Sequence, residues 1–438
     1  MTTTSPSNRS TIHPRLFRLR DPARRNPCDG LTYSSPVAGA GSVCRGNRMS
    51  YSGNGMYHDA DSHIFESPDF YKEFADPVSR QMIGDNCFSG VTIEMFENAL
   101  RGRDGADFTA NADAQLMERK LWNALGAYDG GERSRALDLL GFRSQLVFDS
   151  FMRFHLRTAE QGNDLDLIYG LARTHNRALV EFCSSDPRLL PVGYVPLADI
   201  ERSVKFAEEA IELGCAALQA PADCPRHHSP SHRGFDPMWA LMAESSTPLI
   251  FHLGAGRLAE PTYNLSGRDP EPSFLGGDGS IKSIEYISTP HPVMESLSAL
   301  LVDGVLHDHP DLRVGIIEFG ASWVPGWLHF LDSAMDAFVK HESRLQRLDM
   351  KLSDYVRRQV RVTPFCHENT GWTIAQGGDD VFMFSSDYPH IEGGRNPIAR
   401  FGRSLDASDI SAEARDKFYW KNFEDFMGAR VRQFAVDA

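Results

Sequence analysis

The chain has 438 residues, of which 41% are hydrophobic and 24% are charged, and its formal net charge is −14. A chain of this length can bury one large core or two modest ones, as ordinary globular proteins do. Because it is acidic and has no run rich in lysine or arginine, the sequence argues against nucleic acid or an acidic membrane surface as a partner and favours a small molecule.

Hydropathy and cysteine usage bear on the compartment. No stretch approaches the roughly 18 to 20 consecutive apolar residues that a membrane-spanning helix requires, so no such helix is expected. The seven cysteines are scattered and show no CxxC spacing, which argues against a disulfide framework or a zinc ribbon. This pattern fits a reducing compartment and predicts a cytoplasmic location.

The N-terminal segment differs in composition from the rest of the chain. Its first 50 residues hold eight arginines, two aspartates and no lysine. We expect residues 1–56 to be a disordered or spuriously translated leader, with a targeting peptide as the alternative.

Eight short apolar runs follow, and longer segments with apolar residues three and four apart separate most of them. The runs are residues 59–63, 144–148, 190–196, 215–219, 248–252, 313–319, 360–365 and 381–387, and the helical segments are 164–183, 199–214, 236–245, 294–310 and 325–340. This alternation predicts a (β/α)8 TIM barrel over residues 57–430. It would carry a helical insertion at 90–140, after the first strand, and a long loop at 254–292, after the fifth.

Polar residues stand at the ends of four of the predicted strands. They are Asp61, His63, His252, Glu318 and Asp387. In such a barrel the carboxyl ends of the strands form the active face, and residues two apart in a strand point the same way. Imidazole and carboxylate groups together suit zinc, manganese or iron.

Each of these residues also has a structural interpretation. His252 could be a hydrogen-bonded core histidine, and Asp387 could start a turn. A nearby HxH, His307 and His309, has metal-like spacing but precedes the sixth strand, which places it on the opposite face, so we interpret it as structural.

Several longer stretches resemble the amidohydrolase-related branch of the amidohydrolase superfamily, which includes aminocarboxymuconate-semialdehyde decarboxylase. The similarity runs from about residue 57 to the "YWKNFEDFMG" segment at 419–428. It rests on "DADSHIFESP", "DPMWALMAESSTPLIFHLGAG", "HPDLRVGIIEFGASWVPGWLHFLD" and "FSSDYPHIEGG".

The resemblance implies a mononuclear metal site on a (β/α)8 barrel. Asp61 and His63 take the places of the family's first ligand pair, His252 that of the strand-five ligand, and Asp387 that of the strand-eight aspartate, so these four residues are the expected metal ligands. One divalent ion is expected, zinc first and manganese second. The sequence departs from the family at Glu318, where its decarboxylases usually have an acid/base histidine, and at Asp61, where histidine or glutamate is more usual.

These features predict a metal-dependent hydrolase that attacks a small organic substrate with a metal-activated water. Asp387 would accept the proton, and Glu318 or His390 would protonate the leaving group. The alternative is a non-oxidative decarboxylase of an aromatic or muconate-like acid. A catalytically silent barrel that acts as a binding protein ranks third.

Four further residues are candidates for supporting roles. Trp323, Arg257 and His228 could contact substrate, although helix packing or a solvated loop would explain each of them. Glu66 is either a support for a metal ligand or an exposed carboxylate at a helix start. A homodimer is possible.

Overall fold

A computed structural model describes residues 50–83, 93–103, 108, 111–254, 261–268 and 283–432. Its strands form one parallel sheet in the order β1 to β7, so each strand pairs with its neighbour in the sequence. The strands are β1 (Asp59–His63), β2 (Gln145–Phe148), β3 (Leu189–Tyr194), β4 (Ala217–Gln219), β5 (Leu249–His252), β6 (Val314–Ile317) and β7 (Val360–Val362). The fold is therefore α/β, as predicted.

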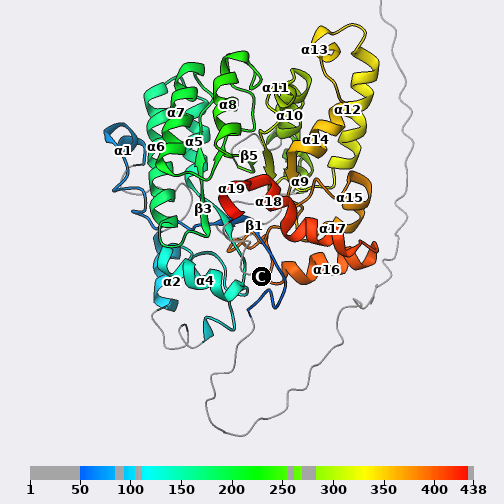
Figure 1. Cartoon of the computed structure of the whole chain (residues 1–438). Helices are drawn as coiled ribbons and strands as arrows, with labels where there is room; N and C mark the ends of the chain where they lie inside the picture. Colours follow the sequence, from blue (N-terminus) through cyan, green and yellow to red (C-terminus); the bar gives the residue numbers. More distant parts are fainter. Residues whose placement is uncertain are drawn as a thin grey trace, which may run out of the picture. The chain divides into compact units, whose positions relative to one another are not determined.

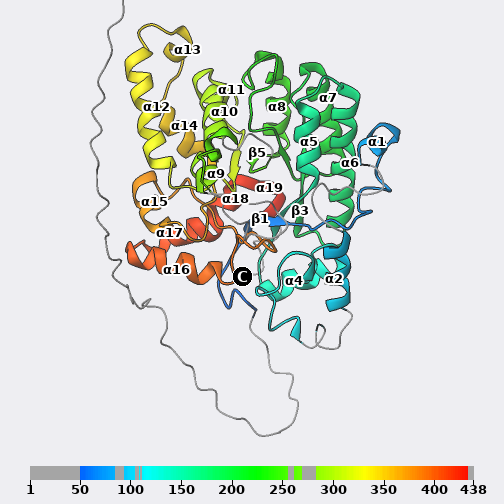
Figure 2. The ribbon, with the colours of Figure 1, turned by 180° about the vertical axis from the view of Figure 1, so that it is seen from behind.

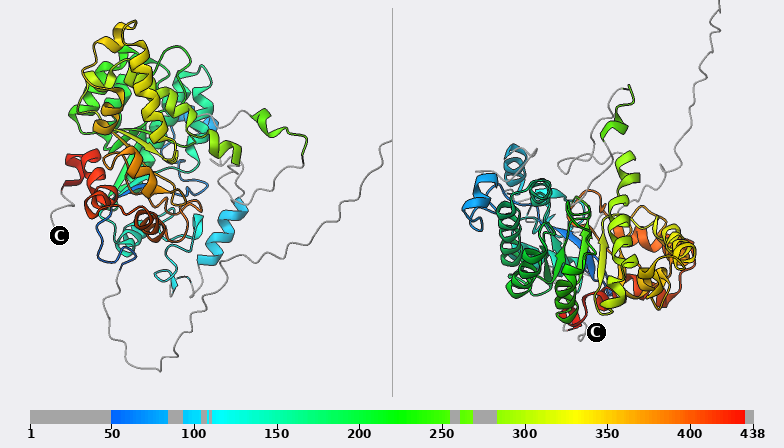
Figure 3. Two further views of the ribbon diagram at one scale, coloured as in Figure 1. Left: turned by 90° about the vertical axis from the view of Figure 1, so that its right-hand side faces the viewer. Right: turned by 90° about the horizontal axis from the view of Figure 1, so that it is seen from above.

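Helices connect the strands and lie around the sheet. Figures 1 and 2 show α6, α7 and α8 along one side of the strands and α12, α14 and α15 along the other, and Figure 3 gives two further views. The main connecting helices are α5 (Met152–Glu160), α6 (Leu165–Cys183), α7 (Ile200–Leu213), α8 (Asp236–Glu244), α10 (His291–Val302), α11 (Val305–Asp308), α12 (Val324–Phe338), α13 (Ser343–Gln346), α14 (Leu352–Gln359) and α15 (Thr370–Gly377).

The remaining helices lie in the two predicted excursions and at the C-terminus. The excursion after β1 holds α1 (Pro77–Ile83), α2 (Ile93–Arg103) and α4 (Gly130–Leu140), and the one after β5 holds α9 (Ser283–Ser288). The C-terminal helices are α16 (Pro397–Ala407), α17 (Ala412–Asp416), α18 (Asn422–Met427) and α19 (Ala429–Arg432). No helix in the described ranges is both long and apolar enough to cross a membrane.

Residues 50–56, which the sequence analysis assigned to the leader, pack against α4. The amide of Tyr51 donates to the carbonyl of Leu139 at 2.8 Å, and that of Ser52 donates to Leu140 at 3.0 Å. Tyr51 also meets the ring of Phe142 edge-on. Tyr51 and Ser52, from the expected leader, thus contact the described fold.

The predicted eighth strand, residues 381–387, is not a regular strand. This segment lies between β7 and β1 but pairs with each through a single parallel bridge, Val362 with Phe382 and Ser62 with Tyr388. The backbone of Asp387 has a φ of 51°, in the left-handed region that extended strands do not use. The segment therefore spans the gap between the two strands with an irregular backbone.

Apolar side chains from the strands pack together in a buried cluster. One buried cluster takes Ala60, Leu146, Val192, Ala217, Ile250 and Ile317 from six strands, together with Phe423, Phe426 and Met427 from α18. Gly315 permits the close approach of α18, because a Cβ at this position would lie 2.7 Å from the Phe426 ring. Apolar packing by the C-terminal helices leaves the carboxyl ends of the strands for polar groups.

A buried carboxylate fastens the irregular segment to β1. Asp59 accepts hydrogen bonds from the amide of Ser386 at 2.7 Å, from the Ser386 hydroxyl at 2.6 Å and from Gln145 Nε2 at 2.7 Å. These bonds fix the backbone immediately before Asp387.

Replacing Asp59 by alanine should lower the free energy of unfolding by about 2 to 4 kcal/mol, because three buried donors lose their acceptor. Urea unfolding followed by circular dichroism measures the change. The matched control is Asp406→Ala, which removes an exposed ion pair with Arg415 and should cost less than about 1 kcal/mol. Equal losses in the two variants would contradict this role for Asp59.

Candidate metal centre

Four side chains that the sequence singled out converge at the carboxyl ends of the strands. Asp61, His63, His252 and Glu318 are buried, and their ligand atoms all lie within 4.8 Å of one another. Asp61 Oδ1 lies 3.0 Å from His63 Nε2 and 3.4 Å from His252 Nε2. Glu318 Oε2 lies 3.6 Å from His252 Nε2. Parallel pairing produces this convergence, since β1, β5 and β6 all end at one rim.

These spacings suit a shared cation. Donor atoms of a tetrahedral site with bonds of about 2.0 to 2.2 Å lie about 3.4 Å apart. His63 Nε2 is buried and makes no hydrogen bond, although Asp61 is only 3.0 Å away. A cavity of about 10 Å³ borders Asp61, Glu318 and Asp387, which is room for about one water molecule or ion. The donor set therefore fits a divalent metal ion.

Both histidines are held with Nε2 toward the centre of the group. His63 Nδ1 lies 2.8 Å from the carbonyl oxygen of Asp149, and His252 Nδ1 lies 2.8 Å from that of Leu253. Each Nδ1 also lies near an Arg153 nitrogen, at 2.9 Å for His63 and 3.2 Å for His252. The carbonyl contacts are the shorter ones, and because a carbonyl oxygen can only accept, they favour a proton on Nδ1 and a lone pair on Nε2. This is the tautomer that a metal ligand needs.

Arg153, which the sequence analysis missed, lies behind the two histidines. Its guanidinium donates to the carbonyls of Asp149 and Leu253, the same two oxygens that orient the imidazoles. It also approaches Glu318 Oε2 to 3.9 Å. Arg153 thus ties both imidazoles and one carboxylate into a single buried network.

Glu66 positions Arg153 by capping the first turn of α5. Its carboxylate accepts from the amides of Ser150, Phe151 and Met152 and from the Tyr71 hydroxyl. Glu66 is fully buried, so the exposed alternative is wrong. Burial, together with the nearby Asp149, raises the pKa of Glu66 to about 7.

Asp387 and His390 form a second group with His63. His390 stacks on the His63 ring with a centroid separation of 3.9 Å, and its Nδ1 lies 3.1 Å from Asp387 Oδ1. The Ser150 hydroxyl donates to the carbonyl of Ile64 at 2.6 Å, so it accepts from His390 Nε2 at 2.8 Å. His390 Nδ1 and Asp387 Oδ1 therefore form an ion pair when the imidazole carries a proton on both nitrogens.

Two of the acidic residues have strained backbones. Glu318 has a φ of 62° and Asp387 a φ of 51°, whereas most non-glycine residues avoid the left-handed region. Each such residue costs on the order of 1 to 3 kcal/mol, and strain of this kind clusters at functional sites. Glu318 and Asp387 are both among the carboxylates that border the small cavity.

The electrostatics of the group depend on its crowded acids. Burial would raise the pKa of Asp61, but the His63 and His252 imidazoles lower it below its ordinary value. Burial, with Asp387 and Asp61 nearby, raises the pKa of Glu318 well above its ordinary value. Burial lowers the pKa of both histidines, which keeps them neutral. A divalent cation would relieve the repulsion among the carboxylates.

Lys120, from the excursion after β1, is a second positively charged side chain near the group, after Arg153. Its Nζ is buried, and no described residue accepts a hydrogen bond from it. The next residue, Leu121, donates its amide to the carbonyl of Pro389 at 3.0 Å, which anchors this part of the chain beside Asp387. Burial lowers the pKa of Lys120 to about 8, although the charge of Asp387 acts to raise it.

The described candidates for substrate contact, Trp323 and His228, do not belong to the metal-binding group. Trp323 donates to the carbonyl of Gly320 and packs edge-on against Trp327, and His228 packs against Phe235. Arg257 lies outside the described residues. The HxH histidines stand before β6, at the opposite end of the strands, where His307 contacts Asp349 and Tyr355.

Three solved structures have a fold similar to that of this chain. An amidohydrolase from Mycobacterium avium subsp. paratuberculosis K-10 is similar with a TM-score of 0.65 at 20% identity, over 86% of this chain and 100% of that one. The 5-carboxyvanillate decarboxylase of Novosphingobium aromaticivorans, complexed with manganese and 4-hydroxy-3-methoxy-5-nitrobenzoic acid, gives 0.55 at 20% identity, over 88% and 99%. The 2,6-dihydroxybenzoate decarboxylase from Rhizobium gives 0.51 at 16%, over 85% and 98%.

The sequence itself was also compared with families and with curated proteins. No curated protein matches it. The family model described as amidohydrolase matches residues 63–426, which include most of the chain and three of the four residues of the metal-binding group. The chain therefore belongs to the amidohydrolase family.

Proposed function

We propose that the protein is a metal-dependent carboxy-lyase that removes carbon dioxide from an aromatic acid. The observation that carries this proposal is the buried group of Asp61, His63, His252 and Glu318, whose ligand atoms lie within 4.8 Å of one another. Two similar structures are decarboxylases of aromatic acids, one with manganese and a benzoic acid analogue, and this supports the reaction class.

We also propose that residues 381–388 complete a (β/α)8 barrel.

The metal would be held by Asp61, His63, His252 and Glu318. Two nitrogens and two carboxylates suit zinc or manganese. When bound, the ion would polarise the substrate's carboxylate and an adjacent oxygen. In this assignment Glu318, rather than Asp387, is the fourth ligand. Asp387, whose Oδ1 lies 3.6 Å from His63 Nε2, is the proton-transfer residue.

Asp387 and His390 would supply the proton that the reaction needs. In decarboxylation the bond from the ring carbon to the carboxylate breaks, its electron pair stays on the ring carbon, and a proton takes the place of carbon dioxide. His390 Nδ1 and Asp387 Oδ1 lie 3.1 Å apart and Asp387 borders the cavity, so a proton carried by this pair would be close to the ring carbon. The Ser150 hydroxyl fixes the other ring nitrogen of His390 as a donor.

Lys120 would attract the substrate carboxylate. Its ammonium is buried without an acceptor, and an unpaired buried charge is costly. An anion bound beside it would remove that cost. The substrate class is therefore an acid, consistent with loss of a carboxylate.

Hydrolysis is the second candidate function. Asp387 Oδ2 is buried and receives no hydrogen bond from the described residues, so it could accept a proton from water. The two reactions differ in their products, since only decarboxylation releases carbon dioxide without consuming water.

The purified full chain should bind about one zinc or manganese ion. His63→Ala and Glu318→Gln should each lower metal affinity at least tenfold, because the first removes a donor atom and the second removes a negative charge from a ligand. Elemental analysis after dialysis measures the metal content. His307→Ala is the matched control, since it removes a histidine at the opposite end of the strands and should retain the metal. Equal metal loss in all three variants would contradict the assigned site.

Asp387→Asn should reduce turnover 100-fold or more while the metal is retained, because the proton-transfer group is lost but the four ligands remain. Release of carbon dioxide from 2,6-dihydroxybenzoate and 5-carboxyvanillate is measured for the wild type and the variant. Water-dependent cleavage of amides or esters without any carbon dioxide release would favour the hydrolase. Unchanged turnover in Asp387→Asn would exclude this role for Asp387.

A further inference from the structure

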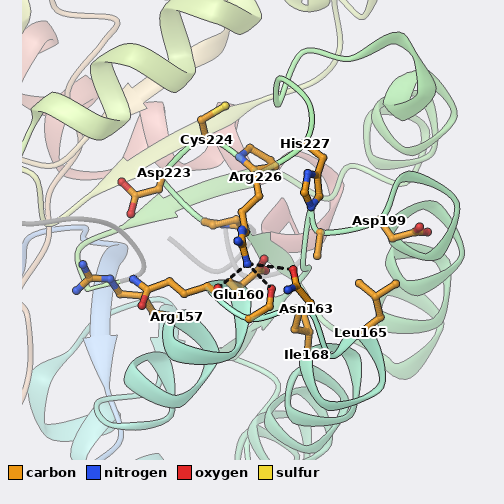
Figure 4. A pocket seen from close by; sticks show the side chains of 15 residues that line it. Arg157, Glu160, Asn163, Leu165, Ile168, Asp199, Asp223, Cys224, Arg226 and His227 are labelled. Atoms are coloured by element: carbon orange, nitrogen blue, oxygen red, sulfur yellow. Dashed lines mark hydrogen bonds between the residues drawn. The ribbon is translucent and has the colours of Figure 1, made fainter.

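A second and larger cavity opens beside α5, at the face where the strands end. Its volume is about 580 Å³, which is within the range of small-molecule sites. The lining includes residues that follow β3, such as Ala198, and residues that follow β4, such as Pro221 (Figure 4). Because β1, β3 and β4 run parallel, this cavity lies at the same end of the sheet as the metal-binding group.

Helix α5 joins the two sites. Arg153, in its first turn, contacts the ligand histidines, and Arg157 and Glu160 line the cavity. Residues at these spacings share one helix face, and four residues correspond to a rise of about 6 Å. A molecule of one or two fused rings therefore has the length to reach from the residues around Arg153 to the cavity.

The cavity wall is held in place by hydrogen bonds. Arg226, from the segment after β4, donates through Nη1 to the carbonyls of Gln161 and Gly162 at 2.8 and 3.1 Å and to Asn163 Oδ1 at 3.0 Å. These are the dashed lines of Figure 4. This clamp fixes the segment after β4 to the turn that follows α5, so the cavity is preformed.

Two of the acidic side chains in the lining are already engaged. Glu160 accepts from the Tyr194 hydroxyl at 3.3 Å, and Asp199 caps α7 by accepting from the Arg202 amide at 2.9 Å. The lining also has apolar surface, from Leu165, Ile168 and Pro221.

Arg157 is the lining residue whose hydrogen-bonding groups are unused. Its Nε is buried without an acceptor, and no described residue accepts from its guanidinium. In Figure 4 its side chain extends away from Arg226 and past Asp223. A guanidinium that lines a cavity is a strong recognition group for a carboxylate, because it can donate two parallel hydrogen bonds.

We propose that this cavity binds the distal end of the substrate and that Arg157 recognises a second carboxylate there. The inference rests on the proposed function, which places the first carboxylate at the metal-binding group. It makes the substrate class an extended aromatic dicarboxylic acid. The apolar wall contacts the ring system, and Arg157 determines specificity without taking part in bond cleavage.

The test compares two probes that share one ring system, naphthalene-2,6-dicarboxylate and naphthalene-2-carboxylate. Isothermal titration calorimetry measures their Kd values for the manganese-loaded full chain. The wild type should bind the dicarboxylate at least tenfold more tightly, and Arg157→Gln should abolish this preference while the monocarboxylate Kd changes less than twofold. Arg157→Lys, which keeps a cation, should retain part of the preference.

Arg202→Gln is the matched control, because it removes an exposed arginine that pairs with Asp166. It should leave both Kd values unchanged, and a melting curve for each variant verifies the fold. Equal affinity of the wild type for the two probes, binding of neither, or a preserved preference in Arg157→Gln would overturn the proposal. An Arg157-dependent preference without carbon dioxide release would instead retain the second carboxylate site and exclude the decarboxylase.

Discussion

The rest of the structure depends on one constraint, the burial of three carboxylates beside two neutral imidazoles. Asp61, Glu318 and Asp387 border a cavity large enough for a single ion, and burial together with the two neighbouring carboxylates raises the pKa of Glu318 well above its ordinary value. Buried like charges at this spacing are unfavourable unless a cation lies among them. Hydrogen bonds to backbone carbonyls direct the lone pairs of His63 and His252 to the same region. The arrangement is therefore best explained as a divalent metal site.

The fold separates this polar group from the apolar core. Strand interiors pack on α18 at one end of the sheet, while the strands end in acids and histidines at the other. Strained backbones at Glu318 and Asp387 aim the two carboxylates, and Asp59 stabilises the irregular segment that carries Asp387. Glu66 stabilises the first turn of α5 and so places the Arg153 guanidinium. Asp59 and Glu66 therefore support the metal-binding group without belonging to it.

Much of the sheet and its polar rim could be predicted from the sequence, because apolar runs mark strands and parallel strands end together. That reasoning identified Asp61, His63, His252, Glu318 and Asp387. It missed Arg153, although Asp149 directly follows β2 and could have drawn attention to the next turn. Lys120 lies in the predicted helical insertion at 90–140, where no motif or strand end indicated a functional residue. The eighth segment is irregular because Asp59 holds the backbone at Ser386 and Asp387 has a left-handed backbone, although the segment still forms backbone hydrogen bonds with β1 and β7.

The most direct test of the metal site is the melting temperature of the full chain, measured after chelation and then during titration with manganese. A ligand that binds the folded state alone stabilises it by about 2.7 kcal/mol when its concentration is 100 times Kd. The metal site described above predicts that the Tm rises by a few degrees and saturates with manganese. A Tm that does not change with manganese or zinc would contradict the claim that this buried group is built around a cation.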